Sequence, residues 1–418
     1  MAGRKKVVVI GGGFAGIQFV RKLDERLFDI TLIDKLNHHQ FQPLFYQVAT
    51  SQIEPSSISF PLRNIFKKKK NLQVRLAEVS RLLPAQNKIE TSIGDFNYDF
   101  LVIAIGCETN FYGNEGLEKN CLTLKSTYDA IRIRNHILLI FEKIISATEE
   151  EKESLLNLVI VGAGPTGVEL AGAFAEIKKY VLPIDYPGID FSKFKIILVE
   201  GSKNTLNSMS ANASRASGKY LEEMGVEILR ETLVNNYDGE TIHFKNGQKI
   251  KTRTVVWAAG VKANVIDGIP SNKLIAGNRI KVDRINKVPS LENVFALGDI
   301  AYMETPFYPK GHPQVANVAI NQANRLAKNL SLMAKGKSTR EFEYRDLGSM
   351  ATIGRNKAVV DFSFVKLKGY FAWLIWMFLH LMLILSVKNK LIIFINWAWA
   401  YVTKNTSLRL ILTDKKKM

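Results

Sequence analysis

A glycine-rich turn between a predicted strand and a predicted helix constrains this chain more than any other feature. The β-branched run Val7 to Ile10 leads into GGGFAG at residues 11–16, and a helical pattern follows. Gly11 permits a tight turn, Gly13 lets backbone approach a pyrophosphate, and Gly16 lets the helix pack closely on the strand. The start of the helix offers free N–H groups and the positive end of its dipole to phosphate oxygens. The pattern therefore predicts a dinucleotide-binding unit.

The same plan occurs a second time. The segment NLVIVGAGPTGVELAG places Gly162, Gly164 and Gly167 after another predicted strand. In both copies the next strand ends in an acid, which is Asp34 in the first copy and Glu200 in the second. A carboxylate at this position accepts hydrogen bonds from a ribose diol and disfavours a 2′-phosphate. We therefore expect NADH rather than NADPH as the mobile cofactor.

The repeat extends beyond the glycines. In the first half, IETSIGDFNYDFLVIAIG reads as a hairpin and a buried strand leading to Gly106. In the second half, TIHFKNGQKIKTRTVVWAAG repeats this order up to Gly260, with Asn246-Gly247 as the hairpin turn. Two copies of one plan predict an α/β protein with two tandem Rossmann-type dinucleotide-binding domains.

Composition adds an anionic partner and argues against several kinds of site. The 418-residue chain has a net charge of +18, and Ser331 to Met418 alone holds 15 Lys and Arg against 5 Asp and Glu. Such a balance favours nucleic acid or an anionic membrane surface as a partner. Two cysteines, Cys107 and Cys121, give neither a disulfide framework nor a thiolate metal cluster. No cluster of His, Cys, Asp and Glu has metal-binding spacing, so we expect no metal.

A third motif points to a wider family. SLENVFALGDIA reads as a buried strand that delivers Gly298 and Asp299. With the two fingerprints it resembles the closing motif of the two-dinucleotide-binding flavoproteins, which have the glutathione-reductase-like fold. The resemblance implies that Asp299 hydrogen-bonds the ribitol of FAD. Disulfide reductases of this fold need two nearby cysteines as a dithiol, which Cys107 and Cys121 do not supply.

Three further stretches narrow the resemblance: NHHQFQPLFYQVATS, VGAGPTGVELAG and YPKGHPQVANVAINQA. Together they resemble the type II NADH:quinone oxidoreductases, the single-subunit alternative NADH dehydrogenases, over nearly the whole chain. The resemblance implies bound FAD, NADH as donor and a membrane quinone, either menaquinone or ubiquinone, as acceptor. It implies hydride transfer from NADH to N5 of the flavin, then transfer of two electrons to quinone without proton pumping. It also implies that Glu169 contacts substrate and delivers protons.

The segment HPQVANVAINQANR at residues 312–325 predicts an amphipathic helix whose polar side is mostly amides. The family has an Ala-Gln-x-Ala-x-Gln motif where this helix meets flavin and quinone. Here the motif reads Ala316-Asn317-x-Ala319-x-Asn321. Asparagine keeps the donor and acceptor of the amide on a shorter arm, so binding a quinone carbonyl requires a shifted headgroup or a bridging water. Uncharged amides bind such a carbonyl without burying a charge.

The expected site residues follow from these motifs and from the resemblance. The FAD set is Gly11, Gly13, Phe14, Ala15, Gly16, Asp34, Lys35, Gln47, Thr50, Gly106, Gly298, Asp299, Val315 and Ala316. The NADH set is Gly162, Gly164, Pro165, Thr166, Gly167, Glu169, Glu200 and Gly260. The quinone set is Gln314, Asn317, Ala319 and Asn321, and the expected catalytic residues are Glu169, Asn317 and Asn321. His38 and His39 are expected to support the flavin pocket or to be exposed.

The C-terminal part has a different character. Tyr370 to Leu385 and Leu391 to Val402 are apolar segments separated by SVKNK, and both are shorter than the ~20 residues of a spanning helix. Their Trp and Tyr residues favour the headgroup level, and flanking basic residues, including Lys415 to Lys417, suit anionic lipid. The pattern favours helices that lie in one leaflet. There are two alternatives: Tyr370–Leu385 forms one short membrane span, or both segments are buried in a soluble core or a dimer interface.

We therefore predict a discontinuous FAD-binding domain at 1–115 and 270–330, an NADH-binding domain at 116–269, and a membrane-association region with amphipathic helices at 331–418. The start MAGRKKVVVIGGG lacks the apolar run of a signal peptide, so we expect the protein on the cytoplasmic face of the cell membrane. The family often dimerises through its C-terminal region, and a homodimer would use the segment Lys335 to Lys368.

Two other classes of function stay open at this stage. One is an FAD-dependent reductase of the sulfide:quinone type, or of a carrier protein such as ferredoxin or rubredoxin. The other is an NADH-responsive flavoprotein sensor with a basic surface for nucleic acid or membrane. Because the basic residues lie beside apolar, Trp-rich segments rather than in a polar groove with interleaved aromatics, we expect no nucleic-acid partner.

Overall fold

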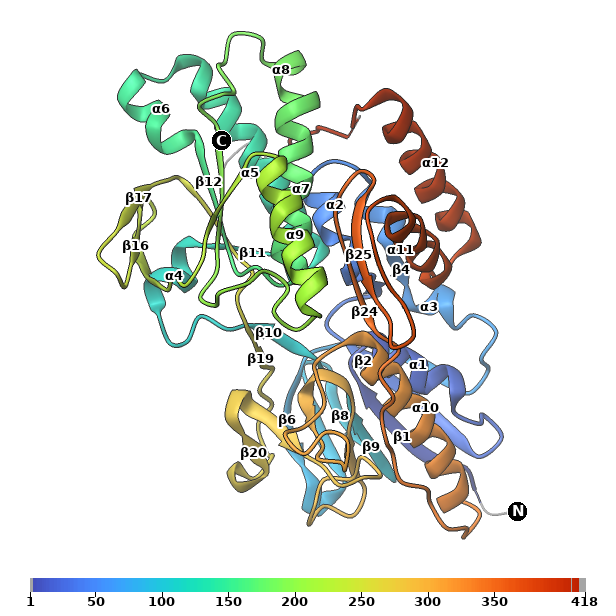
Figure 1. Cartoon of the computed structure of the whole chain (residues 1–418). Helices are drawn as coiled ribbons and strands as arrows, with labels where there is room; N and C mark the ends of the chain where they lie inside the picture. The colour runs from blue at the N-terminus through green and yellow to red at the C-terminus, as the bar shows by residue number, and fades with distance from the viewer. Residues whose placement is uncertain (1–2, 407, 413–418) are drawn as a thin grey trace. The chain divides into compact units, whose positions relative to one another are not determined.

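The computed structural model describes residues 3–406 and 408–412. The chain forms two compact units, each with its own parallel sheet (Figure 1). Unit 1 consists of Met1–Gln40, Phe60–Glu108 and Val261–Arg345, and unit 2 consists of Phe41–Ser59, Thr109–Gly260 and Asp346–Met418. Lys415 to Lys417, which were expected to meet anionic lipid, lie outside the described residues.

Unit 1 contains a five-stranded parallel sheet in the order β22-β9-β1-β2-β5. Its strands are β1 (Lys5–Ile10), β2 (Phe28–Asp34), β5 (Leu72–Leu76), β9 (Phe100–Ile103) and β22 (Val294–Ala296). The last four residues of β1 and the last three of β9 are fully buried, as expected of strands covered on both faces. Helices α1 (Phe14–Lys22) and α10 (Ala316–Met333) lie side by side in this unit (Figure 1).

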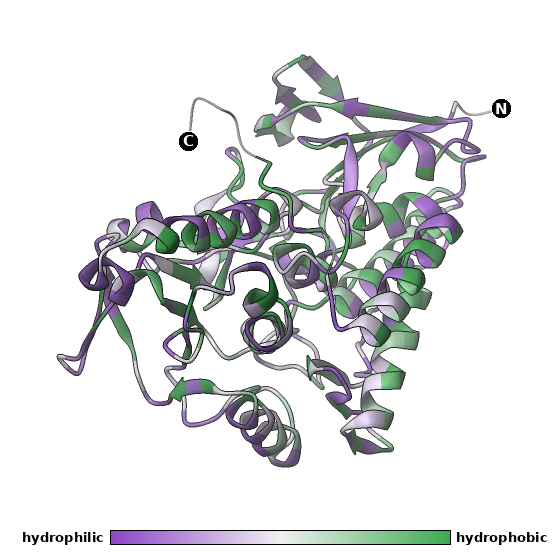
Figure 2. Cartoon of the chain, turned by 90° about the horizontal axis from the view of Figure 1, so that it is seen from above, coloured by the Kyte–Doolittle hydropathy of each residue, from purple (hydrophilic) through white to green (hydrophobic). Residues whose placement is uncertain are grey.

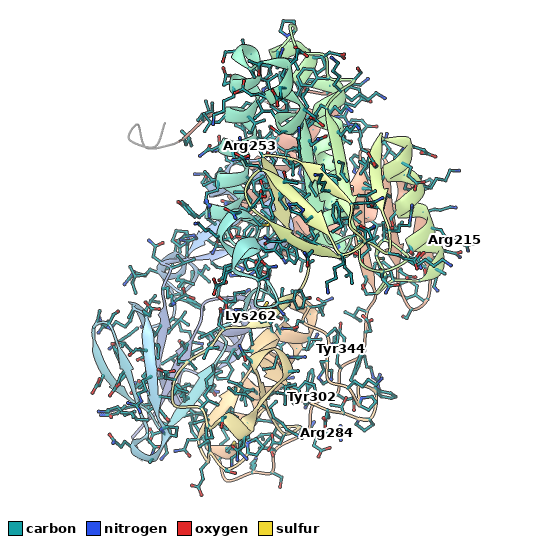
Figure 3. All side chains as sticks on the ribbon, turned by 90° about the vertical axis from the view of Figure 1, so that its left-hand side faces the viewer. Arg215, Arg253, Lys262, Arg284, Tyr302 and Tyr344 are labelled. Carbon is teal, nitrogen blue, oxygen red and sulfur yellow. The ribbon has the colours of Figure 1, made fainter. Side chains whose placement is uncertain are left out.

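The connection from β5 to β9 forms an antiparallel sheet, β6-β7-β8, which confirms the predicted hairpin. Its strands are β6 (Val79–Leu83), β7 (Lys88–Thr91) and β8 (Gly94–Asn97). The other elements of unit 1 are α3 (Leu62–Ile65), η3 (Pro84–Gln86), η4 (Ser271–Lys273), β20 (Leu274–Ile275), η5 (Ala276–Asn278), β21 (Arg279–Lys281), η6 (Gly298–Ile300) and β23 (Ala301–Tyr302). Arg284, which is labelled in Figure 3, holds the last residues of this unit by ion pairs with Glu341 at 2.6 Å and Glu343 at 3.2 Å.

Unit 2 repeats the arrangement with a parallel sheet in the order β11-β18-β12-β13-β14. Its strands are β11 (Leu122–Thr123), β12 (Asn157–Val161), β13 (Lys195–Val199), β14 (Val226–Leu229) and β18 (Thr254–Trp257). An antiparallel sheet of β15 (Val234–Tyr237), β16 (Thr241–Phe244) and β17 (Lys249–Lys251) precedes β18, as β6 to β8 precede β9. Gly247 has a φ of +86° in the predicted hairpin turn. The predicted fold class, with its duplicated nucleotide-binding plan, is therefore confirmed.

The helices that accompany this second sheet are α2 (Phe45–Ala49), α4 (Glu115–Asn120), α5 (Thr127–Ser146), α6 (Glu149–Leu155), α7 (Pro165–Tyr180), α8 (Leu182–Asp185) and α9 (Ala211–Glu223), with the single turns η1 (Gln42–Leu44) and η2 (Pro55–Ile58). Short strands lie where the chain passes from one unit to the other: β3 (His38–Gln40), β4 (Ser59–Pro61), β10 (Cys107–Thr109) and β19 (Val261–Ala263).

The chain after Asp346 adds a sheet and two helices to unit 2. The sheet is antiparallel and consists of β24 (Ser349–Gly354), β25 (Lys357–Asp361) and β26 (Lys366–Lys368). The sequence analysis did not anticipate these strands. Helices α11 (Tyr370–Leu383) and α12 (Val387–Thr403) correspond to the two predicted apolar segments. No helix of the described residues combines the length and apolar character needed to cross a membrane.

Most helices carry both hydrophilic and hydrophobic residues along their length (Figure 2). Helix α11 is an exception, because His380 is its only strongly polar residue in YFAWLIWMFLHLML. Several of its apolar side chains are nevertheless exposed, and only Ala372 and Trp376 are buried. The helix therefore attaches to unit 2 by one side and leaves an apolar side uncovered.

Strand β24 lies directly against helix α7. A Cβ atom at Gly172 would lie 1.7 Å from the carbonyl oxygen of Ile353, so the absence of a side chain permits this approach. The N–H of Thr352 donates to Oε1 of Glu169 at 3.3 Å, and the N–H of Arg355 donates to Oε1 of Glu176. The C-terminal part of the chain is thus held on α7 by close packing and by two backbone hydrogen bonds.

Helix α10 differs from the helix predicted at residues 312–325. It begins at Ala316 and ends at Met333, so His312 and Gln314 precede it. Pro313 disfavours a helical conformation at the residue before it. His312 is also fixed by other contacts: its side chain is buried, and its carbonyl oxygen accepts a hydrogen bond from Arg279 at 3.2 Å. Gln314 therefore lies in a bend before the helix rather than on its polar face.

Replacing Gly172 with Ala is expected to lower the free energy of unfolding by about 1–3 kcal/mol, because the methyl group overpacks the contact with Ile353. Thermal unfolding in mild detergent, followed by circular dichroism, measures the change. Gly188→Ala is the matched control, because nothing lies within 4 Å of a Cβ atom at Gly188. An unchanged unfolding transition in Gly172→Ala would contradict the close contact between α7 and β24.

Candidate functional site

The loop after β1 has the backbone geometry of a phosphate cradle. Gly11 has a φ of +104°, and a Cβ atom there would lie 2.3 Å from the carbonyl oxygen of Ala104. A Cβ atom at Gly16 would lie 1.9 Å from the carbonyl oxygen of Gly11, whereas Gly13 has open space around it. Helix α1 starts at Phe14 with no side-chain cap. The positive dipole end of α1 therefore points to the place where an anion would bind.

Asp34 and His39 hold this loop from two sides. The N–H of Gly12 donates to one carboxylate oxygen of Asp34, and the N–H of Leu36 donates to the other at 2.6 Å. Burial raises the pKa of Asp34 above its ordinary value, and these hydrogen bonds oppose that rise. Nδ1 of His39 lies 3.1 Å from the carbonyl oxygen of Gly12, so this nitrogen carries the proton and donates. Burial lowers the pKa of His39 to about 4, so the ring is neutral at pH 7.

The loop after β12 in unit 2 repeats this geometry. Gly162 has a φ of +101°, and a Cβ atom at Gly167 would lie 1.9 Å from its carbonyl oxygen. Helix α7 begins at Pro165, again with no side-chain cap, after Gly164, which has nothing within 4 Å. Glu200 takes the place of Asp34: its carboxylate accepts the N–H of Ala163 at 2.7 Å and that of Ser202 at 2.8 Å.

The Gly298–Asp299 turn in unit 1 is a convergence of small residues. Gly298 has a φ of +74°, and a Cβ atom there would lie 3.3 Å from Cβ of Ala15 and 3.2 Å from Cβ of Ala319. The small side chains of Ala15 and Ala319 therefore pack closely around this glycine. The thiol of Cys107 donates to Oδ2 of Asp299 at 3.0 Å, which fixes the orientation of the carboxylate.

The amides before and along α10 divide into two groups. Three of them hold other parts of unit 1: Gln314 donates to the carbonyl oxygen of Asp299 at 3.1 Å, Gln322 accepts the N–H of Gly298 at 2.8 Å, and Asn324 accepts from Gln18 at 2.7 Å. Asn321 donates back to the carbonyl oxygen of Asn317 at 2.7 Å. The Asn317 amide lies half-buried in the uncapped first turn of α10. Of the two asparagines expected to bind quinone, Asn317 is therefore the better placed to hydrogen-bond a quinone carbonyl.

Several other expected site residues have clear structural partners. Phe14 packs edge-on against His39 with ring centroids 5.0 Å apart, Lys35 pairs with Glu78, and the carbonyl oxygen of Gly106 accepts the N–H of Asn264 at 3.2 Å. Val315 and Ala316 form the start of α10, and Thr166 is exposed in the first turn of α7. Gly260 has a φ of +82° and adjoins Tyr112, whose hydroxyl would lie 2.2 Å from an added Cβ atom.

Gln47 and Thr50 lie in α2 and just after it, and both belong to unit 2. The Thr50 hydroxyl donates to the carbonyl oxygen of Tyr46 at 2.8 Å. Gln47 is buried; it accepts a hydrogen bond from the indole of Trp397 at 2.8 Å and donates to the hydroxyl of Tyr46 at 2.9 Å. The terminal helix α12 is therefore bonded to a residue that the sequence analysis assigned to the flavin.

Glu169 lies at the buried end of a cavity in unit 2 of about 90 Å³. Helices α7, α11 and α12 and strand β24 supply its walls. The indole of Trp376 is buried there and interacts with the carboxyl group of Glu169 through its N–H. The ring of His380 stacks on Trp376 with centroids 4.0 Å apart. No pattern in the sequence predicted that Trp376 of α11 would contact Glu169 of α7.

Burial raises the pKa of Glu169 to about 8, and hydrogen bonding from the N–H of Thr352 and from the Trp376 side chain only partly opposes this rise. The carboxyl group is therefore mostly protonated and neutral at pH 7. Such a group is able to donate a hydrogen bond or a proton, which an ionised glutamate in water cannot do. No group of three or more His, Cys, Asp and Glu residues suited to a metal ion occurs within residues 3–406 and 408–412.

The pKa shift of Glu169 predicts a pH-dependent stability. Its pKa rises from 4.5 in the unfolded chain to about 8 in the folded protein. The contribution of the neutral acid is therefore present below pH 4.5 and is lost as the pH rises through 8. Glu169→Gln does not titrate, so the free energy of unfolding of the variant relative to the wild type should rise over this window. The rise is at most about 5 kcal/mol, measured by denaturant unfolding across pH. A constant difference between pH 4 and 9 would contradict the shift.

Comparison with known proteins shows similarity over nearly the whole chain. The family model described as pyridine nucleotide-disulphide oxidoreductase matches residues 5–323, and the NDH2 C-terminal domain model matches residues 347–405. The type II NADH:quinone oxidoreductase Ndh of Mycobacterium tuberculosis is 34% identical, over 99% of this chain and 91% of that protein. A type II NADH:quinone oxidoreductase of Staphylococcus aureus is 29% identical, over 85% and 89% respectively.

Solved structures agree on the fold. The structure of NDH2 from Plasmodium falciparum in complex with NADH matches with a TM-score of 0.90 at 22% identity, covering 98% of this chain and 100% of that chain. The sulfide:quinone oxidoreductase of Aquifex aeolicus matches with a TM-score of 0.73 at 20% identity, covering 92% of each chain.

Proposed function

The chain belongs to the type II NADH:quinone oxidoreductases, within the pyridine nucleotide-disulphide oxidoreductase family, and from this premise we propose that it oxidises NADH and reduces a membrane quinone. The overall reaction is NADH + H⁺ + quinone → NAD⁺ + quinol. The observation that carries the proposal is the combination of two uncapped glycine loops with a buried, neutral glutamic acid. The loops suit two dinucleotides, and the acid suits a reaction that consumes a proton.

Unit 1 fits FAD, which when bound accepts a hydride and passes two electrons to an acceptor. The open space at Gly13 and the positive dipole end of α1 suit the pyrophosphate, and Asp34 keeps lone pairs for the ribose hydroxyls. Asp299, held by Cys107, is offered for the ribitol. His39 acts here as a positioning residue for the glycine loop. The uncapped start of α10 brings a positive dipole end to the same unit.

Unit 2 fits NADH by the same physical argument. Gly164 and the first turn of α7 suit the pyrophosphate, and Glu200 suits the adenosine ribose. A 2′-phosphate would place a second negative charge beside the Glu200 carboxylate, so NADH is favoured over NADPH. Lys203 lies three residues after Glu200 and is exposed. Its positive charge would attract a 2′-phosphate and so reduces this preference.

Two residues are proposed for the quinone step. The amide of Asn317 hydrogen-bonds a quinone carbonyl, directly or through one water, and Asn321 and Gln314 shape the same region of unit 1. Glu169 holds the proton that the quinone takes up, because burial keeps its carboxyl group neutral at pH 7. Ala319 leaves space for a flat ring in addition to its packing on Gly298.

A sulfide:quinone type of reaction needs cysteines that carry sulfur. Burial raises the pKa of the Cys121 thiol to about 12, which makes it a poor nucleophile. Cys107 donates its hydrogen bond to Asp299 and belongs to unit 1, whereas Cys121 belongs to unit 2. These positions favour quinone reduction by NADH over sulfur chemistry.

The function is tested on the full-length protein in detergent. The flavin band should bleach when NADH is added without oxygen, and a soluble menaquinone or ubiquinone analogue should restore it. In Glu169→Gln, flavin content and bleaching by NADH should stay normal, while reoxidation by quinone should slow by roughly 10²-fold, the typical effect of losing a general acid.

Absence of bound flavin in the wild type would overturn the proposal as a whole. Bleaching without reoxidation by either quinone analogue would favour a carrier-protein reductase or a sensor. Normal quinone reoxidation in Glu169→Gln would leave the reaction in place and remove this residue from it.

We further propose that α11 and α12 attach the protein to the cytoplasmic face of the cell membrane by lying in one leaflet. Large apolar side chains on both helices are uncovered, with exposed fractions of 71% for Phe371, 61% for Phe378 and 53% for Phe394. Lys388 and Lys390 lie near the turn between the helices and suit anionic headgroups. The opposite sides of the helices hold Trp376 and Trp397 inside unit 2. A second copy of the chain is the alternative occupant of this apolar surface.

Replacing Phe371, Phe378 and Phe394 together with Gln should weaken binding to vesicles that contain phosphatidylglycerol by at least about tenfold, because less apolar area enters the leaflet. Vesicle co-sedimentation measures the loss. Phe307→Gln is the matched control, because Phe307 is 72% exposed but belongs to unit 1. Unchanged vesicle binding, with a shift from dimer to monomer in sedimentation velocity, would assign the surface to a second copy instead.

A further inference from the structure

We propose that Glu176 passes protons from solvent to Glu169 through water molecules in the cavity of unit 2. This inference rests on the proposed function, because it concerns how the acid assigned to the quinone step regains its proton. After Glu169 gives up its proton, a buried carboxylate remains, and the reaction stops unless that carboxylate is reprotonated. The overall reaction takes one proton per NADH from the medium, so a path for that proton is required.

Glu169 and Glu176 lie on one face of α7 and both line the cavity. They are two helical turns apart, which corresponds to roughly 10 Å along the axis. Strand β24 and the turn after it hold both acids, through the N–H groups of Thr352 and Arg355 respectively. The side chain between them on the cavity wall is Ala173, which leaves space where a larger residue would fill it. The two acids are therefore fixed at a spacing that two or three hydrogen-bonded waters span.

The cavity has the size and the polarity that suit water. At about 90 Å³ it is smaller than the roughly 300 Å³ at which sites for small organic ligands begin. It has room for several waters, each of which occupies about 30 Å³ in the liquid. Its walls offer polar partners besides the two acids, including Gln47, Gln52 and Thr352. The buried indole of Trp376 also lines the cavity, beside Glu169.

Burial changes along the cavity from one glutamate to the other. The residues that line it around Glu169, namely Tyr46, Gln47, Thr352, Trp376 and Trp397, are buried. Around Glu176 the lining residues Tyr180 and Arg355 are half-buried, and Tyr401 and Lys404 are exposed. Glu176 is itself half-buried. It therefore stands at the outer end of the cavity, where protons from solvent arrive, and Glu169 stands at the inner end.

The charged groups around the cavity suit this direction of transfer. The guanidinium of Arg355 lies over the rings of Tyr180 and Tyr401, and the ammonium of Lys404 lies over Tyr180. Burial raises the pKa of Glu176, and hydrogen bonding and charge from Arg355, with the charge of Lys357, oppose that rise. At the inner end the titratable neighbours are Tyr46 and His380. Burial raises the pKa of Tyr46 and lowers the pKa of His380, so both side chains are neutral. Among the described residues, cations therefore stabilise the carboxylate of the outer acid and not that of the inner acid.

The test compares Glu176→Gln with Glu176→Asp in the full-length protein. Glutamine keeps an oxygen for the N–H of Arg355 but carries no exchangeable acid, whereas aspartate restores the acid on a shorter arm. In Glu176→Gln, flavin content and bleaching by NADH should match the wild type. Anaerobic reoxidation by quinone should slow at least tenfold, with a larger solvent deuterium isotope effect. Glu176→Asp should recover most of the rate.

A second variant tests the water path and leaves both acids in place. Ala173→Leu fills the wall between them and should slow quinone reoxidation in the same way as Glu176→Gln. Glu222→Gln, at an exposed acid that pairs with Arg230 at 2.6 Å, is the control and should behave like the wild type. Reoxidation within twofold of wild type in both Glu176→Gln and Ala173→Leu between pH 6 and 9 would overturn the relay. Failure of the wild type to be reoxidised by quinone would instead overturn the proposed function.

Discussion

The close approach of strand β24 to helix α7 at Gly172 is the contact on which the cavity of unit 2 depends. Because no side chain separates Gly172 from Ile353, two backbone N–H groups of this segment reach Glu169 and Glu176. Helices α11 and α12 follow in the chain and add Trp376 and Trp397 to the walls. The last part of the chain therefore does two things: it buries an acid so that it stays protonated, and it presents an apolar surface that suits lipid.

The glycine loops after β1 and β12 have the same geometry, and both suit a pyrophosphate. In each, a glycine without a Cβ atom lets the helix pack against the loop, and an acid from the next strand accepts a loop N–H. The surroundings then give the units different tasks. In unit 1 a Gly-Asp turn and the amides around α10 surround the first loop, whereas in unit 2 helix α7 continues from the second loop to Glu169.

The features that could be predicted from the sequence are those that a local pattern of residues determines. Strand, glycines, helix and acid are adjacent in the chain, so the duplicated fold and the loops at Gly11 and Gly162 were readable. Contacts between distant segments were not. Nothing near Gln47 indicates its bond to Trp397, and nothing near Glu169 indicates that Trp376 covers it. The start of α10 was misplaced because Pro313 and the buried His312 override a helical pattern. The short strands β24 to β26 also lack a periodic signal long enough to read.

The central claim is that the C-terminal segment keeps Glu169 protonated at neutral pH, as a proton store for the reduction of quinone. Infrared spectroscopy of the full-length protein tests this directly, by following the carbonyl band of a protonated carboxyl group that disappears in Glu169→Gln. This band should titrate with a midpoint near pH 8. A midpoint near 4.5, the ordinary value for glutamate, would show that the acid is ionised at neutral pH and would contradict the account.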